Sequence, residues 1–150
     1  MDTSDATDID VLITEGTMLK RTDKCIHEHE VSMKMASVMN AFKYVFVLAS
    51  ATDIERLATV KEAAKQAQKP LCIWSLFMKK TMEFFTQREA KLSRGLFDFK
   101  PLFFSYKMFN KLKRGGFVMV VGTSKKDDVS ELIEKLPQEN TLLIYSSWDG

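Results

Sequence analysis

The sequence predicts an α/β fold: a mostly parallel sheet with helices on both faces, in a three-layer, Rossmann-like arrangement. Short apolar segments alternate along the chain with longer segments of helical periodicity, and this alternation favours parallel strands joined by right-handed crossovers. The apolar segments are nearly continuous, as in strands that are buried on both faces. The 150 residues, of which 45% are hydrophobic and 28% charged, are typical of one globular domain.

Five segments have the apolar, β-rich composition of strands. The clearest is "YVFVLAS" at 44–50, and "GGFVMVVG" at 115–122 starts with a Gly-Gly turn. A last strand is expected in "NTLLIYSS" at 140–147. The strands expected in the sheet are residues 10–14, 44–49, 70–74, 117–122 and 141–146.

Four segments between these strands have apolar residues at helical spacing. In the first, Val31, Met35 and Phe42 recur on one face. The second begins with "TDIE", a capping-box pattern in which the Thr52 hydroxyl accepts from the amide three residues on and Glu55 reaches back. The acidic residues 1–8 are expected to be frayed. The expected helices are residues 28–42, 52–68, 76–93 and 125–136.

Charge and cysteine content exclude several classes of function. Lys and Arg number 22 against 20 Asp and Glu, and a net charge of +2 does not by itself indicate nucleic-acid binding. Cys25 and Cys72 lie far apart and indicate neither a disulfide framework nor a thiolate zinc site. No apolar run reaches the ~18 residues of a membrane span and no signal-peptide pattern is present. We therefore expect a cytoplasmic location and no membrane partner.

Candidate site residues follow three of the predicted strands, because ligands gather at the carboxyl ends of parallel strands. Glu15 follows the first strand, the stretch from Ser50 to Arg56 follows the second, and residues 146–150 follow the fifth. Taken alone, Glu15 reads as a solvated loop acid, and helix capping explains Thr52. The start of the second helix still offers free backbone amides that can hold a phosphate, with Arg56 one turn inside. No glycine-rich phosphate loop is present.

Two further stretches invite a functional reading. "HEHE" at 27–30 contains possible metal ligands, but on a helix His27 and His29 lie on different faces, so we expect a solvated helix start. The aromatic segment 96–109 is more often core than a base-stacking platform. Lysines are interleaved with it from Lys100 to Lys113, which leaves a partner-facing role open for residues 96–114.

Three stretches together resemble a known group of proteins. "DVLITEGTMLKR" and "YVFVLASATDIERLATVKEAAKQAQKPL" resemble, in order and spacing, the β-CASP group of metallo-β-lactamase-fold nucleases, which includes ribonuclease J and the pre-mRNA cleavage endonuclease. "GFVMVVG" followed by "LLIYSSWDG" is similar to the end of the β-CASP insertion. The resemblance covers most of residues 8–150 and is weakest over 76–114.

The resemblance implies a role for Glu15 and a parent protein around this chain. In the family, the acid of "TEGT" lies beside the metal centre and handles protons, so Glu15 is the residue expected to be catalytic. The family's two zinc ions are held by a His-x-His-x-Asp-His motif and later histidines, and this chain contains none of these. The resemblance therefore implies a cap domain, not catalytic by itself and holding no cofactor, from a longer zinc-dependent nuclease.

The implied partners are RNA or DNA in the parent's channel and the parent's metallo-β-lactamase domain. Ser50, Thr52 and Arg56 would face backbone phosphates there. Ribonuclease J-like members tend to carry Asn and His before this Arg, whereas this chain has Asp53 and Glu55.

Two other readings stay open. A Toprim-like, magnesium-dependent nucleic-acid domain also ends its first strand in Glu-Gly, but it binds magnesium through Asp-x-Asp, and here only Asp53-x-Glu55 is present. A doubly wound binding module without catalytic function is the second alternative. The sequence alone does not separate RNA from DNA, or endo- from exonucleolytic attack.

Overall fold

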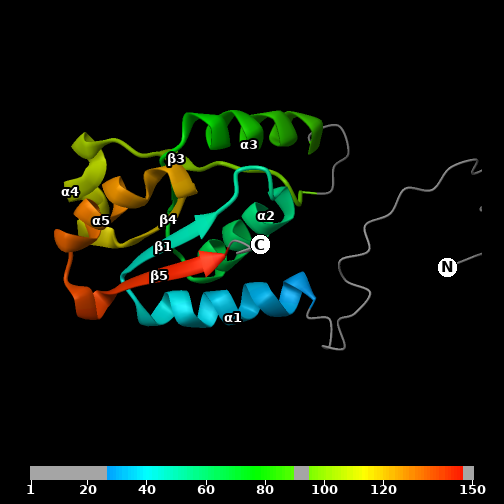
Figure 1. The fold of residues 1–150 in the computed structure, drawn as a ribbon. Helices are drawn as coiled ribbons and strands as arrows, with labels where there is room; N and C mark the ends of the chain where they lie inside the picture. The colour runs from blue at the N-terminus through cyan, green and yellow to red at the C-terminus, as the bar shows by residue number, and fades with distance from the viewer. Residues whose placement is uncertain (1–26, 90–94, 147–150) are drawn as a thin grey trace, which may run out of the picture.

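The computed structural model describes residues 27–89 and 95–146, which form an α/β fold on a five-stranded, fully parallel sheet (Figure 1). The strand order is β3-β2-β4-β1-β5, so β4 is the middle strand and lies between β2 and β1. The predicted fold class is confirmed. The strands are β1 (Tyr44–Ala49), β2 (Leu71–Ile73), β3 (Leu102–Phe103), β4 (Phe117–Val121) and β5 (Thr141–Ser146).

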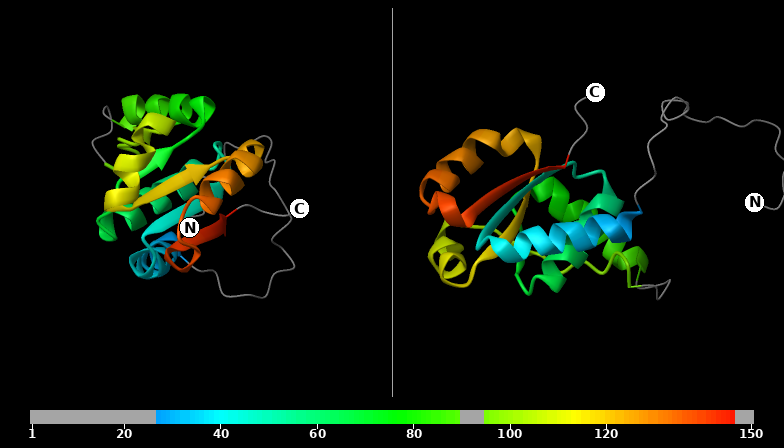
Figure 2. Two further views of the ribbon diagram at one scale, coloured as in Figure 1. Left: turned by 90° about the vertical axis from the view of Figure 1, so that its left-hand side faces the viewer. Right: turned by 90° about the horizontal axis from the view of Figure 1, so that it is seen from below.

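Helices cover both faces of the sheet. One hydrophobic cluster joins the first three helices to the sheet, and a second cluster joins the last two to the opposite face. Figure 2 shows α1 and α5 on opposite sides of β1 and β5. Within the described residues, no helix is long and apolar enough to cross a membrane. The helices are α1 (Glu28–Ala41), α2 (Ile54–Gln66), α3 (Leu76–Glu89), α4 (Tyr106–Gly115) and α5 (Lys126–Glu134).

The continuous apolar run of β1 follows from this three-layer packing. Successive side chains of a strand point to opposite faces. Val45 and Val47 belong to the cluster under α1, α2 and α3, whereas Phe46 and Leu48 belong to the cluster under α4 and α5. All six residues of β1 are buried. A strand between two helical layers therefore has no polar face, and its sequence does not alternate.

The segment after α3 differs from the prediction. Sequence analysis expected neither β3 nor α4, and it treated residues 96–109 as one aromatic segment. β3 has only two residues, and both Leu102 and Phe103 are exposed, so no hydrophobic period marks it. The expected strand at 10–14 and the end of the third expected helix, beyond Glu89, lie outside the described residues.

The start of α2 also corrects the prediction. The helix begins at Ile54 with Asp53 as its N-cap, and the Asp53 carboxylate accepts from the backbone N–H of Arg56 at 3.0 Å. The expected capping box, with Thr52 as the cap, is therefore wrong. The Thr52 hydroxyl is bonded to the Ser50 hydroxyl instead, at 2.8 Å. An ionised carboxylate accepts more strongly than a hydroxyl, which favours Asp53 in this role.

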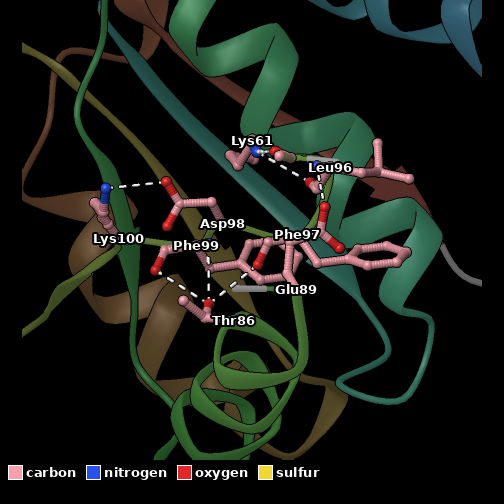
Figure 3. A network of polar contacts seen from close by, with 9 residues as sticks. Lys61, Thr86, Glu89, Leu96, Phe97, Asp98, Phe99 and Lys100 are labelled. Atoms are coloured by element: carbon pink, nitrogen blue, oxygen red, sulfur yellow. Dashed lines mark hydrogen bonds and ion pairs between the residues drawn. The ribbon is translucent and has the colours of Figure 1, made fainter. Parts of the chain in front are cut away.

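A polar network fixes residues 95–99, which precede β3, to their neighbours (Figure 3). The Lys61 ammonium donates to the carbonyls of Gly95 and Leu96 at 3.1 and 3.0 Å. Glu89 is buried, and its carboxylate accepts from the Leu96 N–H at 2.9 Å. The Thr86 hydroxyl lies 3.0 Å from the Phe97 carbonyl. These hydrogen bonds hold the segment against both α2 and α3. Burial lowers the pKa of Lys61.

Candidate functional site

The neighbouring strands β2 and β4 define a topological switch point. β2 leads through α3 to β3 at one edge of the sheet, whereas β4 leads through α5 to β5 at the other edge. The two helices leave to opposite faces of the sheet. In open parallel sheets, ligands bind in the crevice that such diverging connections form at the carboxyl ends of the strands. The turns that flank this point are residues 74–75 after β2 and residues 122–125 after β4, and the turn of residues 50–53 follows β1, the other neighbour of β4.

The turn after β1 is the stretch that the sequence singled out. Ser50 and Thr52 lie side by side, because their hydroxyls are 2.8 Å apart and the Thr52 N–H donates to the Ser50 hydroxyl at 3.3 Å. Both side chains are exposed. One of the free amides at the start of α2 is already used, since Asp53 accepts from the N–H of Arg56. The two hydroxyls are thus exposed and bonded to each other, while part of the helix N-terminus is occupied.

Arg56 is directed away from these hydroxyls, toward α1. Its guanidinium donates to Glu28 at 3.1 Å, and the other oxygen of that carboxylate accepts from the Thr59 hydroxyl at 2.5 Å. The Arg56 and Glu28 side chains are 26% and 46% exposed, so this is a surface ion pair, a class worth about 0–1 kcal/mol. The structure therefore brings Ser50 and Thr52 together, and it pairs Arg56 with an acid that sequence analysis had not linked to it.

The other predicted site residues are largely beyond the described ranges. Glu15 lies outside them, so its place relative to the sheet is not described. Of residues 146–150, Ser146 ends β5, and it pairs in register with Ala49, the last residue of β1. This register places the end of β5 beside the Ser50 turn.

An aromatic and basic group on the β4 side of the switch point was missed by sequence analysis. Trp74 directly follows β2, and the Lys125 ammonium lies 5.3 Å from the centre of its ring. The ring of Trp74 also contacts Phe104 and Tyr106, with centroids 4.9 and 5.6 Å apart, and Tyr106 is exposed. Lys125 is further held by Asp128 at 2.6 Å. A signal was present, because Trp74 is the last residue of a predicted strand, but the strand order was needed to bring Lys125 next to it.

The described residues offer little for metal chemistry. His27 is the N-cap residue of α1, and His29 lies exposed in its first turn. Across residues 27–89 and 95–146, no group of three or more His, Cys, Asp or Glu side chains is placed to hold a metal ion. The chemistry this edge can supply is anion binding by hydroxyls and amides, with aromatic rings and a lysine on the β4 side.

Comparisons with known proteins give no relative. Compared with known protein families and with curated proteins, the sequence matches none of either. The fold, the switch point and the residues around it therefore carry the functional argument.

Proposed function

We propose that this chain is the nucleic-acid-facing cap of a zinc-dependent metallo-β-lactamase-fold hydrolase, an RNA-processing nuclease of the β-CASP kind, and that it is not catalytic by itself. The resemblance of three stretches in the right order supports this. The observation that carries it is the parallel pairing of β1 with β4, which puts the Ser50 turn at the carboxyl edge of the sheet, where ligands bind. The cytoplasm is the compartment that we propose with this function.

In this proposal the parent's catalytic domain holds the metal ions, and the cap contributes a proton-handling carboxylate and contacts to the nucleic-acid backbone. Zinc bound in the parent's metallo-β-lactamase domain would lower the pKa of a water and neutralise charge on the phosphodiester. Glu15 would accept or return a proton beside that centre. The Ser50 and Thr52 hydroxyls would donate to backbone phosphates of RNA, or of DNA, along the channel wall.

Arg56 takes part only if it changes partners. Because the pair with Glu28 is exposed and weak, a phosphate with its higher charge can replace the carboxylate. Glu28 then competes with the phosphate for Arg56 and lowers the affinity of Arg56 for nucleic acid. Glu28 would thus set how strongly the cap side of the channel binds nucleic acid.

The catalytic assignment is tested in the full-length parent by Glu15→Gln, which removes the proton acceptor and keeps the shape. We expect turnover to fall by roughly 10²–10⁴-fold, the usual contribution of a general acid–base group. Glu139→Gln, an exposed acid in the turn before β5, is the matched control and should cleave at the normal rate. If Glu15→Gln also cleaves normally, Glu15 is only a loop acid.

The phosphate contact is tested by Arg56→Ala in the same parent. Nucleic-acid binding should weaken, and the slope of log affinity against log salt should fall by about one, as expected for one lost phosphate contact. Lys65→Ala, an exposed cation near the other end of the same helix, is the control. An unchanged salt slope for Arg56→Ala would mean that Arg56 serves only its pair with Glu28.

The alternatives make different predictions. A Toprim-like magnesium site needs the Asp53 carboxylate, but that group caps α2. A non-catalytic binding module is favoured by one observation, the neutralisation of Arg56 by Glu28. If both variants leave cleavage and nucleic-acid binding intact, the binding module becomes the better reading.

A further inference from the structure

A cavity of about 380 Å³ lies between α1 and α2, apart from the hydroxyls of the Ser50 turn. Helix α1 contributes Glu28 and Ser32 to its walls, and α2 contributes Glu55, Thr59 and Glu62. This volume is within the range of small-molecule sites. None of the residues proposed above to contact a phosphate lines the cavity, and Glu28, the partner of Arg56, is the residue that the two sites share.

Ser32 gives this cavity an unusual polar group. The residue is only 3% exposed, and its hydroxyl has no hydrogen-bond partner among the described residues. It is also the one buried side-chain polar atom in residues 27–89 and 95–146 found in this state. Buried polar groups are nearly always hydrogen-bonded, so a hydroxyl of this kind on a cavity wall points to a ligand that bonds to it.

The charge of the walls selects a cation. Glu28, Glu55 and Glu62 line the cavity together with one histidine, His29, and no Lys or Arg among the described residues does. Glu28 is already engaged by Arg56 and Thr59. Among the described residues, the contacts of the Glu62 carboxylate are long ones, with Lys65 at 4.0 Å and Gln66 at 3.4 Å. The carboxylates of Glu55 and Glu62 are therefore the ones open to a ligand.

The spacing of these two acids adds a length requirement. They are seven residues apart on α2, which is about two turns and roughly 10 Å along the helix axis, on one face. Ala58 lies between them on the same wall, and Leu96 lines the cavity from the stretch after α3. The site thus has two negative ends with an apolar middle. A bare metal ion does not suit it, because no group of three ligating side chains converges among the described residues.

We propose that this groove binds a linear aliphatic diamine of the polyamine class. Its two ammonium groups bond to the carboxylates of Glu55 and Glu62, the Ser32 hydroxyl accepts from one of them, and the methylene chain packs on Ala58 and Leu96. Glu28 and Thr59 form the fixed wall, because they are already bonded to each other.

The binding test uses the whole chain and three probes, followed by calorimetry and by backbone amide shifts. 1,5-Diaminopentane should bind and shift the amides of residues 28–32 and 55–62. 1,5-Pentanediol has the same length without charge and should not bind. Nα-acetyl-lysine amide presents one ammonium, as a protein side chain does, and should bind at least about tenfold more weakly, for one lost charged pair. Equal binding by the lysine derivative, or any comparable binding by the diol, overturns the diamine assignment, and so does a lack of diamine binding.

Variants locate the site. Glu55→Gln, Glu62→Gln and Ser32→Ala should each weaken diamine binding about tenfold, since each loses one charge-assisted interaction with an ammonium group. Glu30→Gln is the matched control, an exposed acid in the first turn of α1 that does not line the cavity, and its affinity should not change. If Glu30→Gln weakens binding as much as Glu55→Gln, the diamine senses only the general charge of the surface and the proposal fails.

Discussion

The two faces of the sheet are filled by side chains of very different size. The cluster under α1, α2 and α3 contains six buried alanines and one buried aromatic residue, Phe99. The cluster under α4 and α5 contains no alanine and five buried aromatic residues, among them Phe46 and Phe117. Small side chains let α1 and α2 approach each other and the sheet, and the groove with Ser32 lies between these helices. We therefore expect the stability of the protein to be sensitive to added volume on the face under α1, α2 and α3, and to lost volume on the face under α4 and α5.

The largest effect is expected from removing volume on the aromatic face. Phe46 is fully buried, and its ring meets that of Phe117 edge-on with centroids 5.4 Å apart. Phe46→Ala should lower the free energy of unfolding by about 3–5 kcal/mol, through lost burial and a residual cavity. Urea denaturation of the whole chain measures it. Leu143→Ala, at a position that is 52% exposed, is the control and should change stability by less than about 0.5 kcal/mol. Equal effects would show that the aromatic face is loosely packed.

The opposite change tests the alanine-rich face. Ala63 is fully buried on α2, against the sheet. Ala63→Leu adds three carbons where no space is open, and it should lower the free energy of unfolding by about 1–3 kcal/mol. Gln66→Leu places a similar side chain at an exposed position of the same helix and should be nearly neutral. If Ala63→Leu is neutral too, this face is loosely enough packed to accept a larger side chain, and the contrast between the faces is wrong.

The same contrast shows what the sequence could predict about the fold. β1 and β4 were predictable because strands covered on both faces carry unbroken apolar runs, and α1 and α2 because their apolar residues recur at helical spacing. β3 was not, because two exposed residues carry no period. The structure was also needed to show which face each helix covers. In a buried run such as "YVFVLA" the residues directed to either face of the sheet are apolar, so the sequence does not distinguish the two faces.

The candidate site was predictable in place but not in its contacts. The rule that ligands bind at the carboxyl ends of strands located the Ser50 turn correctly at that edge. The pairing of Arg56 with Glu28 joins residues 28 positions apart, and no local pattern reports it. The position of Lys125 over Trp74 depends on β2 and β4 being neighbours, which the chain order does not reveal.

A smaller effect should come from the pH dependence of the aromatic face. Burial in β2 raises the pKa of the Cys72 thiol from 9.0 to about 12. Above pH 9 the unfolded chain releases this proton while the folded chain keeps it, so stability falls as pH rises from 9 toward 12. The loss approaches about 1.4 kcal/mol per pH unit. Denaturation at pH 8 and pH 10 should show a smaller fall for Cys72→Ala than for the native chain. Cys25 is present in both proteins, so its titration cancels, and equal falls would mean that water reaches the Cys72 thiol.

The smallest effect concerns the start of α2, the helix that supplies three of the six buried alanines to its face. Asp53 accepts from the Arg56 N–H, so Asp53→Ala leaves that amide without its cap and should cost about 1 kcal/mol. Asp53→Asn keeps an accepting oxygen at the same place and should retain most of the stability. Thr52→Ala removes only an exposed contact with the Ser50 hydroxyl and should cost less than half as much as Asp53→Ala. Thermal unfolding of the three variants ranks them directly. A larger loss for Thr52→Ala than for Asp53→Ala would restore the capping box read from "TDIE", and with it a carboxylate at Asp53 that is free to repel or bind a ligand at the switch point.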